Sequence, residues 1–360
     1  MDSTLSSRIA AFDELLLAKK DAGFPWYPYY SLGGLYEIEL ELEKQGMSIA
    51  PYLANGPVLD LCTADGDVAF FLESQGCAVT AVDLPHTNFN QMAGVRRMRE
   101  ALDSKIEIVE MDIDTRFSLP GRYELAIFMG ALYHLKNPYS VLATLAWHAR
   151  YAVISTRVAR FTPDRAIAMH AAPLAYLVAG DETNNDDTNF WIFSEAGLRR
   201  LLERTHWRVE KLILLGNAES SDPASDEGDQ RAFCIVESRA YDQPILLLRG
   251  WHEQEPDGWF WSERVFLFEV HACAEIELRL CLPEALANAL GEVTLTAHCL
   301  GEFVQTLRMP SAGEYSFRVN IPPGNGSAYL HCELDKVMPR GSFDDKRELG
   351  IMLLAMRRIS

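Results

Sequence analysis

The sequence predicts an α/β protein built on a mostly parallel sheet, preceded by a helical segment and followed by an antiparallel β-sandwich. Three observations predict this arrangement. Short apolar runs alternate with helix-like stretches between about residues 57 and 156, as in βαβ units. After Tyr241 short strand-like runs separated by turn clusters replace this alternation. A chain of 360 residues is also long enough for two domains.

The N-terminal segment, residues 1–44, is expected to be helical and to be interrupted by the aromatic, proline-rich stretch 24–30. Its first residues include acids where a signal peptide would have a basic region before a long apolar core. The longest apolar stretch, 166–180, contains His170 and Pro173 and is shorter than the ~20 residues that span a bilayer. We expect a soluble, cytoplasmic protein without membrane insertion.

The central domain, residues 45–240, is expected to hold the parallel sheet. Strands covered on both faces are apolar nearly throughout, which predicts strands over 57–62, 77–83, 105–112, 123–130 and 151–156. Helices are predicted over 64–76, 87–102, 138–149, 163–179 and 194–205. Two closing strands are predicted at 207–216 and 231–239, joined by an acidic, solvated loop.

The C-terminal domain, residues 241–360, is expected to be an antiparallel sandwich. Strand-like runs fall at 264–270, 274–281, 292–299, 303–308, 315–320, 327–334 and 348–358. A short helix is predicted at 283–290.

Charge and cysteine content narrow the function classes. The chain has 33 Lys and Arg against 51 Asp and Glu, a formal net charge of −18. Nucleic-acid binding depends on neutralising phosphates with a basic face, so nucleic acid is an unlikely partner. The seven cysteines are odd in number and include no C-x-x-C pair. Buried thiols in a reducing compartment are expected, rather than a disulfide framework or a zinc site.

The turn after the first predicted strand places small residues beside acids. It reads DLCTADGD over 60–67. A strand-to-helix turn of small residues lets the backbone approach a ligand. Asp83 ends the second predicted strand, 23 residues after Asp60, where an acid suits ribose hydroxyls.

Polar residues also follow the third and fourth predicted strands. Asp112 is placed to accept a hydrogen bond from an adenine amino group, with Ile113 or Met111 against the ring. Tyr133 and His134 follow the fourth strand, in the crevice where open α/β sheets bind ligands.

The segments VLDLCTADGD, VTAVD, EMDID and FMGALYHLKNP together resemble class I S-adenosylmethionine (SAM) dependent methyltransferases over roughly residues 45–240. LYHLKNP and FWIFSEAGLRRLLERTHW resemble the branch that contains wobble-uridine tRNA carboxymethyl transferases. The resemblance implies a Rossmann-like, seven-stranded methyltransferase sheet with SAM as cofactor. It implies that Asp60 and the 62–66 turn hold the methionine part, Asp83 the ribose and Asp112 the adenine. The full implied cofactor set is Asp60, Cys62, Ala64, Gly66, Asp83, Leu84, Asp112, Ile113, Met129 and Gly130.

The turn departs from the family pattern, which has glycines at the positions of Cys62, Ala64 and Gly66; only Gly66 remains. Cys and Ala are small enough for close approach if their φ is negative. A positive φ at Cys62 would cost on the order of 1 kcal/mol or more.

Three residues are candidates for the reaction itself. His134 is the candidate general base, since its reference pKa lies near neutrality; the alternative is that His134 and Tyr133 only line the cofactor. Arg157 follows the fifth strand and is a candidate clamp for a carboxylate or phosphate of the acceptor, with a surface ion pair as the alternative. The polar loop around Asp186, with Asn185 and Asp187, matches no metal motif, and no metal is predicted.

Aromatic residues outside the sheet have two interpretations each. Trp26, Tyr29 and Tyr30 either cover the cofactor site as a lid or pack with the N-terminal helices. The C-terminal region, with GWH at 250–252, GWFWS at 258–262 and DKRELG at 345–350, resembles small β-sandwiches attached to polysaccharide-assembly enzymes. Its tryptophans either stack on sugars or belong to the sandwich core.

The favoured function is SAM-dependent methylation, at oxygen, of a sugar, glycan or related small metabolite. A catalytically degenerate binding or scaffold module is a second hypothesis, motivated by the missing glycines. A tRNA-modifying transferase is a third, and the net charge of −18 argues against it. The sequence leaves the oligomeric state open.

Overall fold

The computed structural model describes residues 4–53, 55–115, 117–183, 186–219, 221–224, 229–243, 245–271, 275–299, 301–321 and 327–359. The chain divides into two compact units, Met1–Tyr241 and Asp242–Ser360. Asn185, one of the residues considered for a metal, lies outside the described residues.

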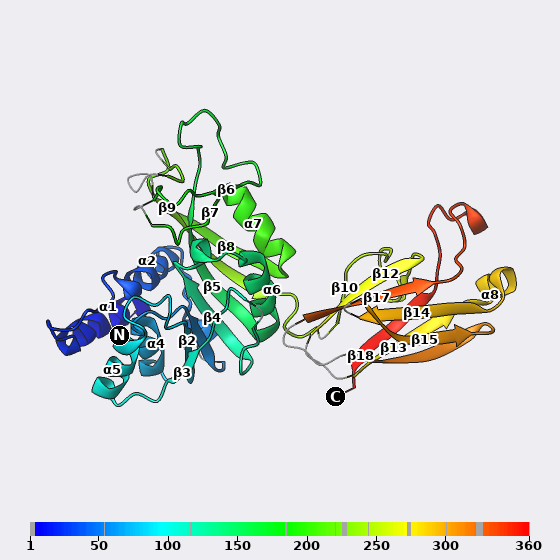
Figure 1. The fold of residues 1–360 in the computed structure, drawn as a ribbon, viewed down its shortest axis with the longest axis horizontal. Helices are drawn as coiled ribbons and strands as arrows, with labels where there is room; N and C mark the ends of the chain where they lie inside the picture. The colour runs from blue at the N-terminus through cyan, green and yellow to red at the C-terminus, as the bar shows by residue number, and fades with distance from the viewer. Residues whose placement is uncertain are drawn as a thin grey trace. The chain divides into compact units, whose positions relative to one another are not determined.

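The first unit contains a parallel sheet (Figure 1). Its strands are β1 (Val58–Leu61), β2 (Val79–Asp83), β3 (Glu107–Glu110), β4 (Tyr123–Met129) and β5 (Ala149–Val158), in the order β3-β2-β1-β4-β5. β1 is buried along its whole length, because helices cover both faces of the sheet. The carboxyl ends of all five strands meet at one edge, where the polar turns lie.

Two long antiparallel strands close this sheet. β9 (Gln230–Ser238) pairs with β5, and β8 (Trp207–Gly216) pairs with β9. These seven strands confirm the predicted methyltransferase-type sheet. Two short strands, β6 (Ala175–Leu177) and β7 (Trp191–Phe193), extend it beyond β5.

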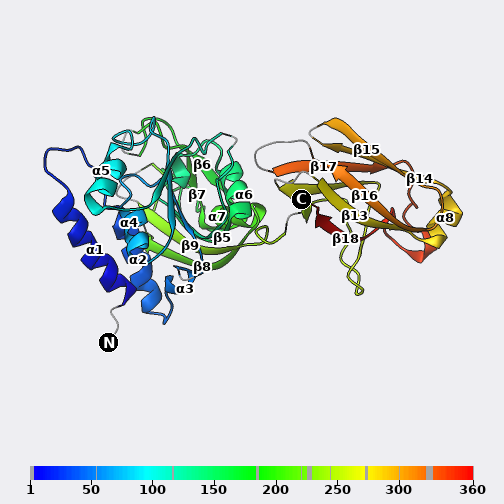
Figure 2. The same ribbon diagram turned by 90° about the horizontal axis from the view of Figure 1, so that it is seen from below.

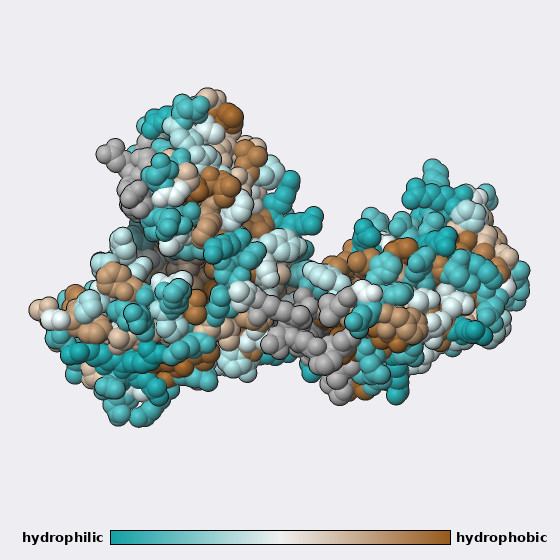
Figure 3. All heavy atoms as spheres, viewed as in Figure 1, coloured by the Kyte–Doolittle hydropathy of each residue, from teal (hydrophilic) through white to brown (hydrophobic). Residues whose placement is uncertain are grey.

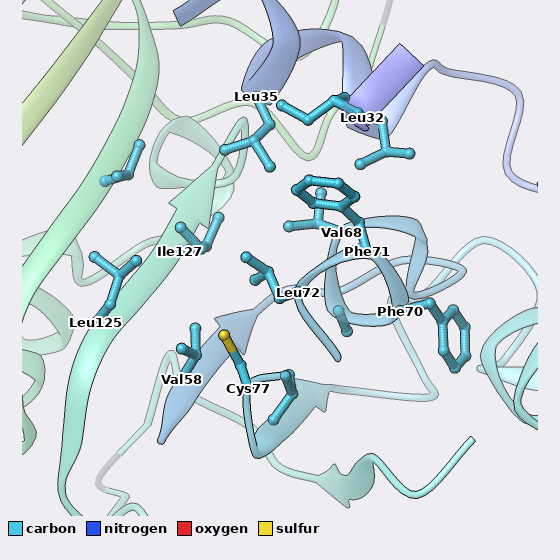
Figure 4. Close-up of a cluster of buried hydrophobic side chains, with 14 of the residues drawn as sticks. Leu32, Leu35, Val58, Val68, Phe70, Phe71, Leu72, Cys77, Leu125 and Ile127 are labelled. Carbon is cyan, nitrogen blue, oxygen red and sulfur yellow. The ribbon is translucent and has the colours of Figure 1, made fainter. Parts of the chain in front are cut away.

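Helices flank the sheet on two sides (Figures 1 and 2). One group comprises α1 (Leu5–Lys19), α2 (Ser31–Glu43), α4 (Asp67–Ser74) and α5 (Ala93–Leu102), and the other α6 (Pro138–His148) and α7 (Glu195–Arg204). A short helix, α3 (Ala50–Leu53), precedes β1. Leu32 and Leu35 of α2 pack with Phe71 of α4 over the sheet residues Leu125 and Ile127 (Figure 4). The N-terminal helices therefore share the core of the sheet.

The helix predicted over 163–179 is wrong. The segment instead contains an isolated bridge between Phe161 and Ala168 and the strand β6, which pairs with β7. Pro173 cannot donate a helical hydrogen bond and disfavours helix in the residue before it. Arg165 has a φ of +58°, which also breaks a helix. Most apolar side chains of this segment are exposed, among them Ile167, Leu174 and Leu177, so its apolar composition indicated neither helical structure nor burial.

The second unit is a sandwich of two antiparallel sheets, as predicted. One sheet has the order β10-β12-β17-β14-β15 and the other β11-β18-β13-β16. The strands are β10 (Ile245–Leu247), β11 (Phe260–Trp261), β12 (Val265–His271), β13 (Glu275–Leu282), β14 (Val293–Cys299), β15 (Glu302–Met309), β16 (Gly313–Asn320), β17 (Ser327–Leu334) and β18 (Met352–Arg358), with α8 at Glu284–Leu290.

The tryptophans of the second unit contact aromatic neighbours. Trp251 packs against Phe266 and Phe268, at ring-centroid distances of 4.6 and 5.1 Å. Trp261 also packs against the sandwich core and lies 5.6 Å from the ring of Trp259. Trp251 and Trp261 thus contribute to the core of this unit.

The face of the molecule in Figure 3 is mainly hydrophilic, with scattered apolar side chains. Within the described part of the chain, every helix is too short or too polar to cross a membrane.

Candidate active site

A cavity of about 690 Å³ opens at the carboxyl ends of β1 and β4. Its described lining comes mainly from five parts of the chain: the N-terminal segment, the turn after β1, the segment after β4, the polar loop before β7 and the β8–β9 hairpin. This volume lies in the range of small-molecule and cofactor sites.

The turn after β1 has a left-handed backbone at three positions. Cys62 and Ala64 have φ of +60° and +51°, and Gly66 has φ of +84°. A side chain in this region costs roughly 1–2 kcal/mol per residue. The shape of the turn is therefore the one that glycines normally supply, and here Cys62 and Ala64 adopt it under strain.

Asp60, a residue of β1, stabilises this turn. It is 4% exposed, and its Oδ2 accepts a hydrogen bond from Thr63 Oγ1 at 2.5 Å. Burial raises the pKa of Asp60 to about 7; the nearby Asp83 adds to the increase, and the Thr63 bond opposes it. Asp60 also lines the cavity, so a charged ligand bound there would shift its pKa and therefore its ionisation.

Asp83, the last residue of β2, stabilises the same turn. Its Oδ2 accepts from the Ala64 N–H at 2.9 Å and from Asn88 Nδ2 at 3.0 Å, and its Oδ1 accepts from the Leu84 N–H at 2.8 Å. Burial raises the pKa of Asp83, while these hydrogen bonds oppose the increase. A carboxylate has about four acceptor positions, so three are used here and one remains; Asp83 itself is not among the described lining of the cavity.

Four further residues of the set assigned to the cofactor are Asp112, Ile113, Leu84 and Gly66. Asp112 is exposed, and its Oδ1 accepts from the Asp114 N–H at 3.0 Å. Ile113 is buried, and Leu84 is half-buried next to Asp83. Gly66 begins α4, and a Cβ there would lie 2.7 Å from Val95. These residues are not among the described lining of the cavity.

The N-terminal segment covers the turn. The Tyr27 N–H donates to Asp65 Oδ2 at 2.6 Å, and Asn90 Nδ2 donates to Asp65 Oδ1 at 2.8 Å. Tyr27, Tyr29 and Tyr30 line the cavity, whereas Trp26 packs against the core cluster. The sequence analysis did not single out Tyr27 or Asp65. The position of Asp65 directly before Gly66 in the turn was the feature of the sequence that could have indicated its role.

His134 lies in a short 3-10 turn, Leu132–His134, and lines the cavity together with Met129, Gly130 and Tyr133. Its Nδ1 is 3.1 Å from the carbonyl oxygen of Thr188 and 3.0 Å from Thr188 Oγ1. The Thr188 hydroxyl in turn donates to Asp186 Oδ1 at 2.7 Å. Burial lowers the pKa of His134 below its usual 6.5.

Arg157 and Arg231 face each other across β5 and β9. Arg157 is 4% exposed and is not among the described lining residues; its Nη2 donates to the carbonyl oxygen of Asp222. Arg231 does line the cavity. Asp229 lies between them, with its Oδ2 accepting from Arg231 Nε at 3.1 Å and its Oδ1 3.5 Å from Arg157 Nε. The sequence analysis expected Arg157 to point into the crevice and did not single out Arg231, which is the arginine of the described lining.

Among the described residues, no group of three or more His, Cys, Asp or Glu is arranged to hold a metal ion. Asp186 is instead bonded to Thr188. The cysteines of the described ranges are free thiols, and burial raises the pKa of Cys62 well above its usual value.

Comparison with known families gives one match, in which residues 38–212 match the model of a family described as "Methyltransferase domain". The match spans the region from α2 to β8, including the turn, Asp83 and His134. The first unit has the class I methyltransferase fold. A methyltransferase domain of this class implies SAM as the cofactor.

The residues of the methyltransferase domain fit this cofactor. The small side chains of Cys62 and Ala64 leave the turn open to close approach, and the cavity is large enough for a ligand of this size. Glu37 lines the cavity and favours a sulfonium cation electrostatically, and a bound cation would favour the ionised form of Asp60, whose pKa is about 7.

Solved structures similar to this chain include the N-terminal domain of EvdMO1 with S-adenosylhomocysteine (SAH) bound. It is 14% identical, with 65% of this chain and 95% of that chain covered and a TM-score of 0.41. A SAM-dependent methyltransferase from Clostridium acetobutylicum is 11% identical (64% and 96% covered, TM-score 0.39). A putative methyltransferase from Bacillus halodurans is 15% identical (55% and 98% covered, TM-score 0.41). A search of curated proteins gives no match.

Proposed function

We propose that this protein transfers a methyl group from SAM to a hydroxyl oxygen of a sugar or related small metabolite, with His134 as the general base. When bound, SAM supplies an electrophilic methyl group on a sulfonium. The residues assigned to hold it are Asp60, Cys62, Ala64, Gly66, Asp83, Leu84, Asp112, Ile113, Met129 and Gly130.

The observation that carries the proposal is the hydrogen bonding of His134. A backbone carbonyl accepts but cannot donate, so Nδ1 bears the proton toward Thr188 O. The Thr188 hydroxyl donates to Asp186 and is therefore also an acceptor toward Nδ1. Nε2 is left as the nitrogen with the lone pair. Because burial lowers its pKa, the ring is neutral at pH 7 and ready to accept a proton.

The proposed step balances as an in-line displacement. The acceptor oxygen forms the new C–O bond as the S–CH₃ bond breaks, and that bond's electron pair remains on sulfur. The hydroxyl proton passes to His134 Nε2. The products are a methyl ether, SAH and a proton released when His134 returns to its neutral form. The protein aligns the acceptor, which supplies much of the rate enhancement in such reactions.

Two features support a small polar acceptor. The cavity admits a molecule of limited size beside the cofactor. Tyr29 and Tyr30 line it and are 67% and 54% exposed, so they offer aromatic faces to a sugar ring. The net charge of −18 disfavours a tRNA acceptor.

A second candidate, a binding module without turnover, is favoured by the strained turn alone. This candidate predicts that the protein binds SAM, that Asp83→Ala leaves this binding unchanged, and that no methyl group is transferred.

The test begins with calorimetric titration of SAH, followed by transfer from methyl-labelled SAM to a panel of sugars and hydroxy metabolites. We expect one SAH site per chain and labelled product that is lost in His134→Gln. His86→Gln is the matched control, because His86 is exposed and does not line the cavity. Absence of saturable SAH binding would remove the enzyme assignment. Equal turnover by wild type and His134→Gln would remove the base assignment.

A further inference from the structure

Arg231 is the only described residue in the cavity lining that carries a permanent positive charge. The charged residues around it in that lining are acids, among them Asp60, Asp186 and Asp229. The net charge of the chain is −18, so a positive charge in the wall of the cavity is unusual for this protein. Arg231 is the group in the described lining to which an anionic ligand would bind.

The guanidinium of Arg231 is held in a fixed position. Its Nε donates to Asp229 Oδ2 at 3.1 Å, and the guanidinium carbon lies 5.9 Å from the centre of the Tyr133 ring. The second carboxylate oxygen of Asp229 lies 3.5 Å from Arg157 Nε, an ion-pair contact without a hydrogen bond.

Donors of Arg231 remain for a ligand. A guanidinium has five N–H donors in a planar fork that matches two oxygens of a carboxylate or phosphate. The bond to Asp229 and the contact with Tyr133 use only part of this set. Pre-organisation of the remaining donors reduces the entropy lost on binding.

The position of Arg231 in the sheet assigns it to the acceptor. The residues proposed for the cofactor lie at the ends of β1, β2, β3 and β4, whereas Arg231 is on β9, two strands beyond β4 in the order β1-β4-β5-β9. Strands are spaced about 4.8 Å apart, so β9 lies about 14 Å from β1. The ring of Tyr133, beside Arg231, is 4.3 Å from the ring of His134.

We propose that Arg231 binds an anionic group of the acceptor, a carboxylate or a phosphate, while a hydroxyl of the same molecule reaches His134. The acceptor is then a hydroxylated anion, such as an acidic sugar or a sugar phosphate, rather than a neutral sugar. This inference rests on the proposed function. The same chemistry has a second source, the methionine carboxylate of the cofactor, and the test distinguishes the two.

The first arm titrates inorganic phosphate and acetate into SAH-saturated protein. We expect saturable binding to wild type, weakened about tenfold or more in Arg231→Gln and partly restored in Arg231→Lys, which keeps the charge but not the planar fork. Arg208→Gln is the control, because Arg208 belongs to the same hairpin but pairs with Glu237 outside the cavity. No saturable binding to wild type, or equal binding to Arg231→Gln, would overturn the proposal.

The second arm compares SAH with 5′-methylthioadenosine, which lacks the methionine carboxylate. We expect Arg231→Gln to leave the affinity for both unchanged, which also shows that the variant is folded. A selective loss of SAH affinity would assign Arg231 to the cofactor and overturn the acceptor assignment. Failure of the proposed function would instead appear as absence of SAH binding to wild type.

Discussion

The two halves of the cavity are built from different kinds of sequence. The half beside β1 and β2 is a short turn supported by Asp60 and Asp83, all within 24 residues of chain, from 60 to 83. The half beside β4 and β9 is assembled from segments distant in sequence: His134 is bonded to Thr188, 54 residues away, and Arg231, with its near neighbour Asp229, comes from β9 and the residue before it. The first half fixes a backbone shape, and the second presents reactive and charged groups.

This difference separates binding from chemistry. Asp60 and Asp83 are occupied by the turn, and their main role is to hold left-handed residues in place. His134 retains one nitrogen, and Arg231 several donors, for a molecule in the cavity. Changes in the first half should therefore affect cofactor affinity, and changes in the second should affect turnover and acceptor choice.

The largest expected effect is in the second half. His134→Gln removes the proposed base, and general-base catalysis typically contributes about 10²–10⁴-fold. We expect kcat to fall by this factor while the dissociation constant of SAH is unchanged, measured by methyl transfer and by calorimetry. A parallel loss of SAH affinity would mean that His134 belongs to the cofactor half and would break the comparison.

A smaller effect is expected in the first half from Asp83→Asn. The amide keeps the shape but lacks the charge that accepts from the Ala64 and Leu84 N–H groups. Losing charged hydrogen bonds typically costs about 1.5–3 kcal/mol, so SAH affinity should fall on the order of tenfold to a hundredfold. At saturating SAM, kcat should change little. Asp103→Asn is the control, because the Asp103 side chain is 96% exposed.

The pH dependence sharpens the role of the second half. A base must be neutral, so activity is lost as pH falls through the pKa of His134. Since burial lowers this pKa, the acid limb should lie below pH 6.5, with a tenfold loss per pH unit. The pH profile of kcat at saturating SAM measures it, because the titration of Asp60, whose pKa is about 7, would enter kcat/KM through cofactor binding. An acid limb above pH 6.5 would contradict the buried, neutral ring.

The smallest effect tests the strain in the turn. Ala64→Gly relieves a φ of +51° and should raise the free energy of unfolding by about 0.5–1 kcal/mol, the steric relief less the entropic cost of glycine. Ala101→Gly, at an exposed position of α5, should lower it by about 0.5–1 kcal/mol. Urea denaturation measures both. Equal decreases in the two variants would show that the turn is not strained.

The contrast also explains what the sequence could predict. The alternating strands and helices, the sandwich and the turn with its acids are local patterns, and they were predicted. Asp186 and Arg231 reach the cavity only through the folding of distant segments, so no spacing indicated them. Arg157 and Arg231 occupy paired positions on antiparallel strands, and sequence alone does not show which of them reaches the cavity.

The predicted helix over 163–179 failed for a related reason. Its residues Ala175–Leu177 form a strand because β7 lies beside them. Tertiary pairing decided the structure of this segment, whereas Pro173 and the φ of Arg165 exclude a continuous helix.

The most direct measurement is calorimetric titration of SAH into wild type, Asp83→Asn and His134→Gln under one set of conditions. We predict one saturable site per wild-type chain, a weakened site in Asp83→Asn and an unchanged site in His134→Gln. Absence of binding to wild type, or equal affinity in wild type and Asp83→Asn, would contradict the claim that the strained turn and its acids hold the cofactor.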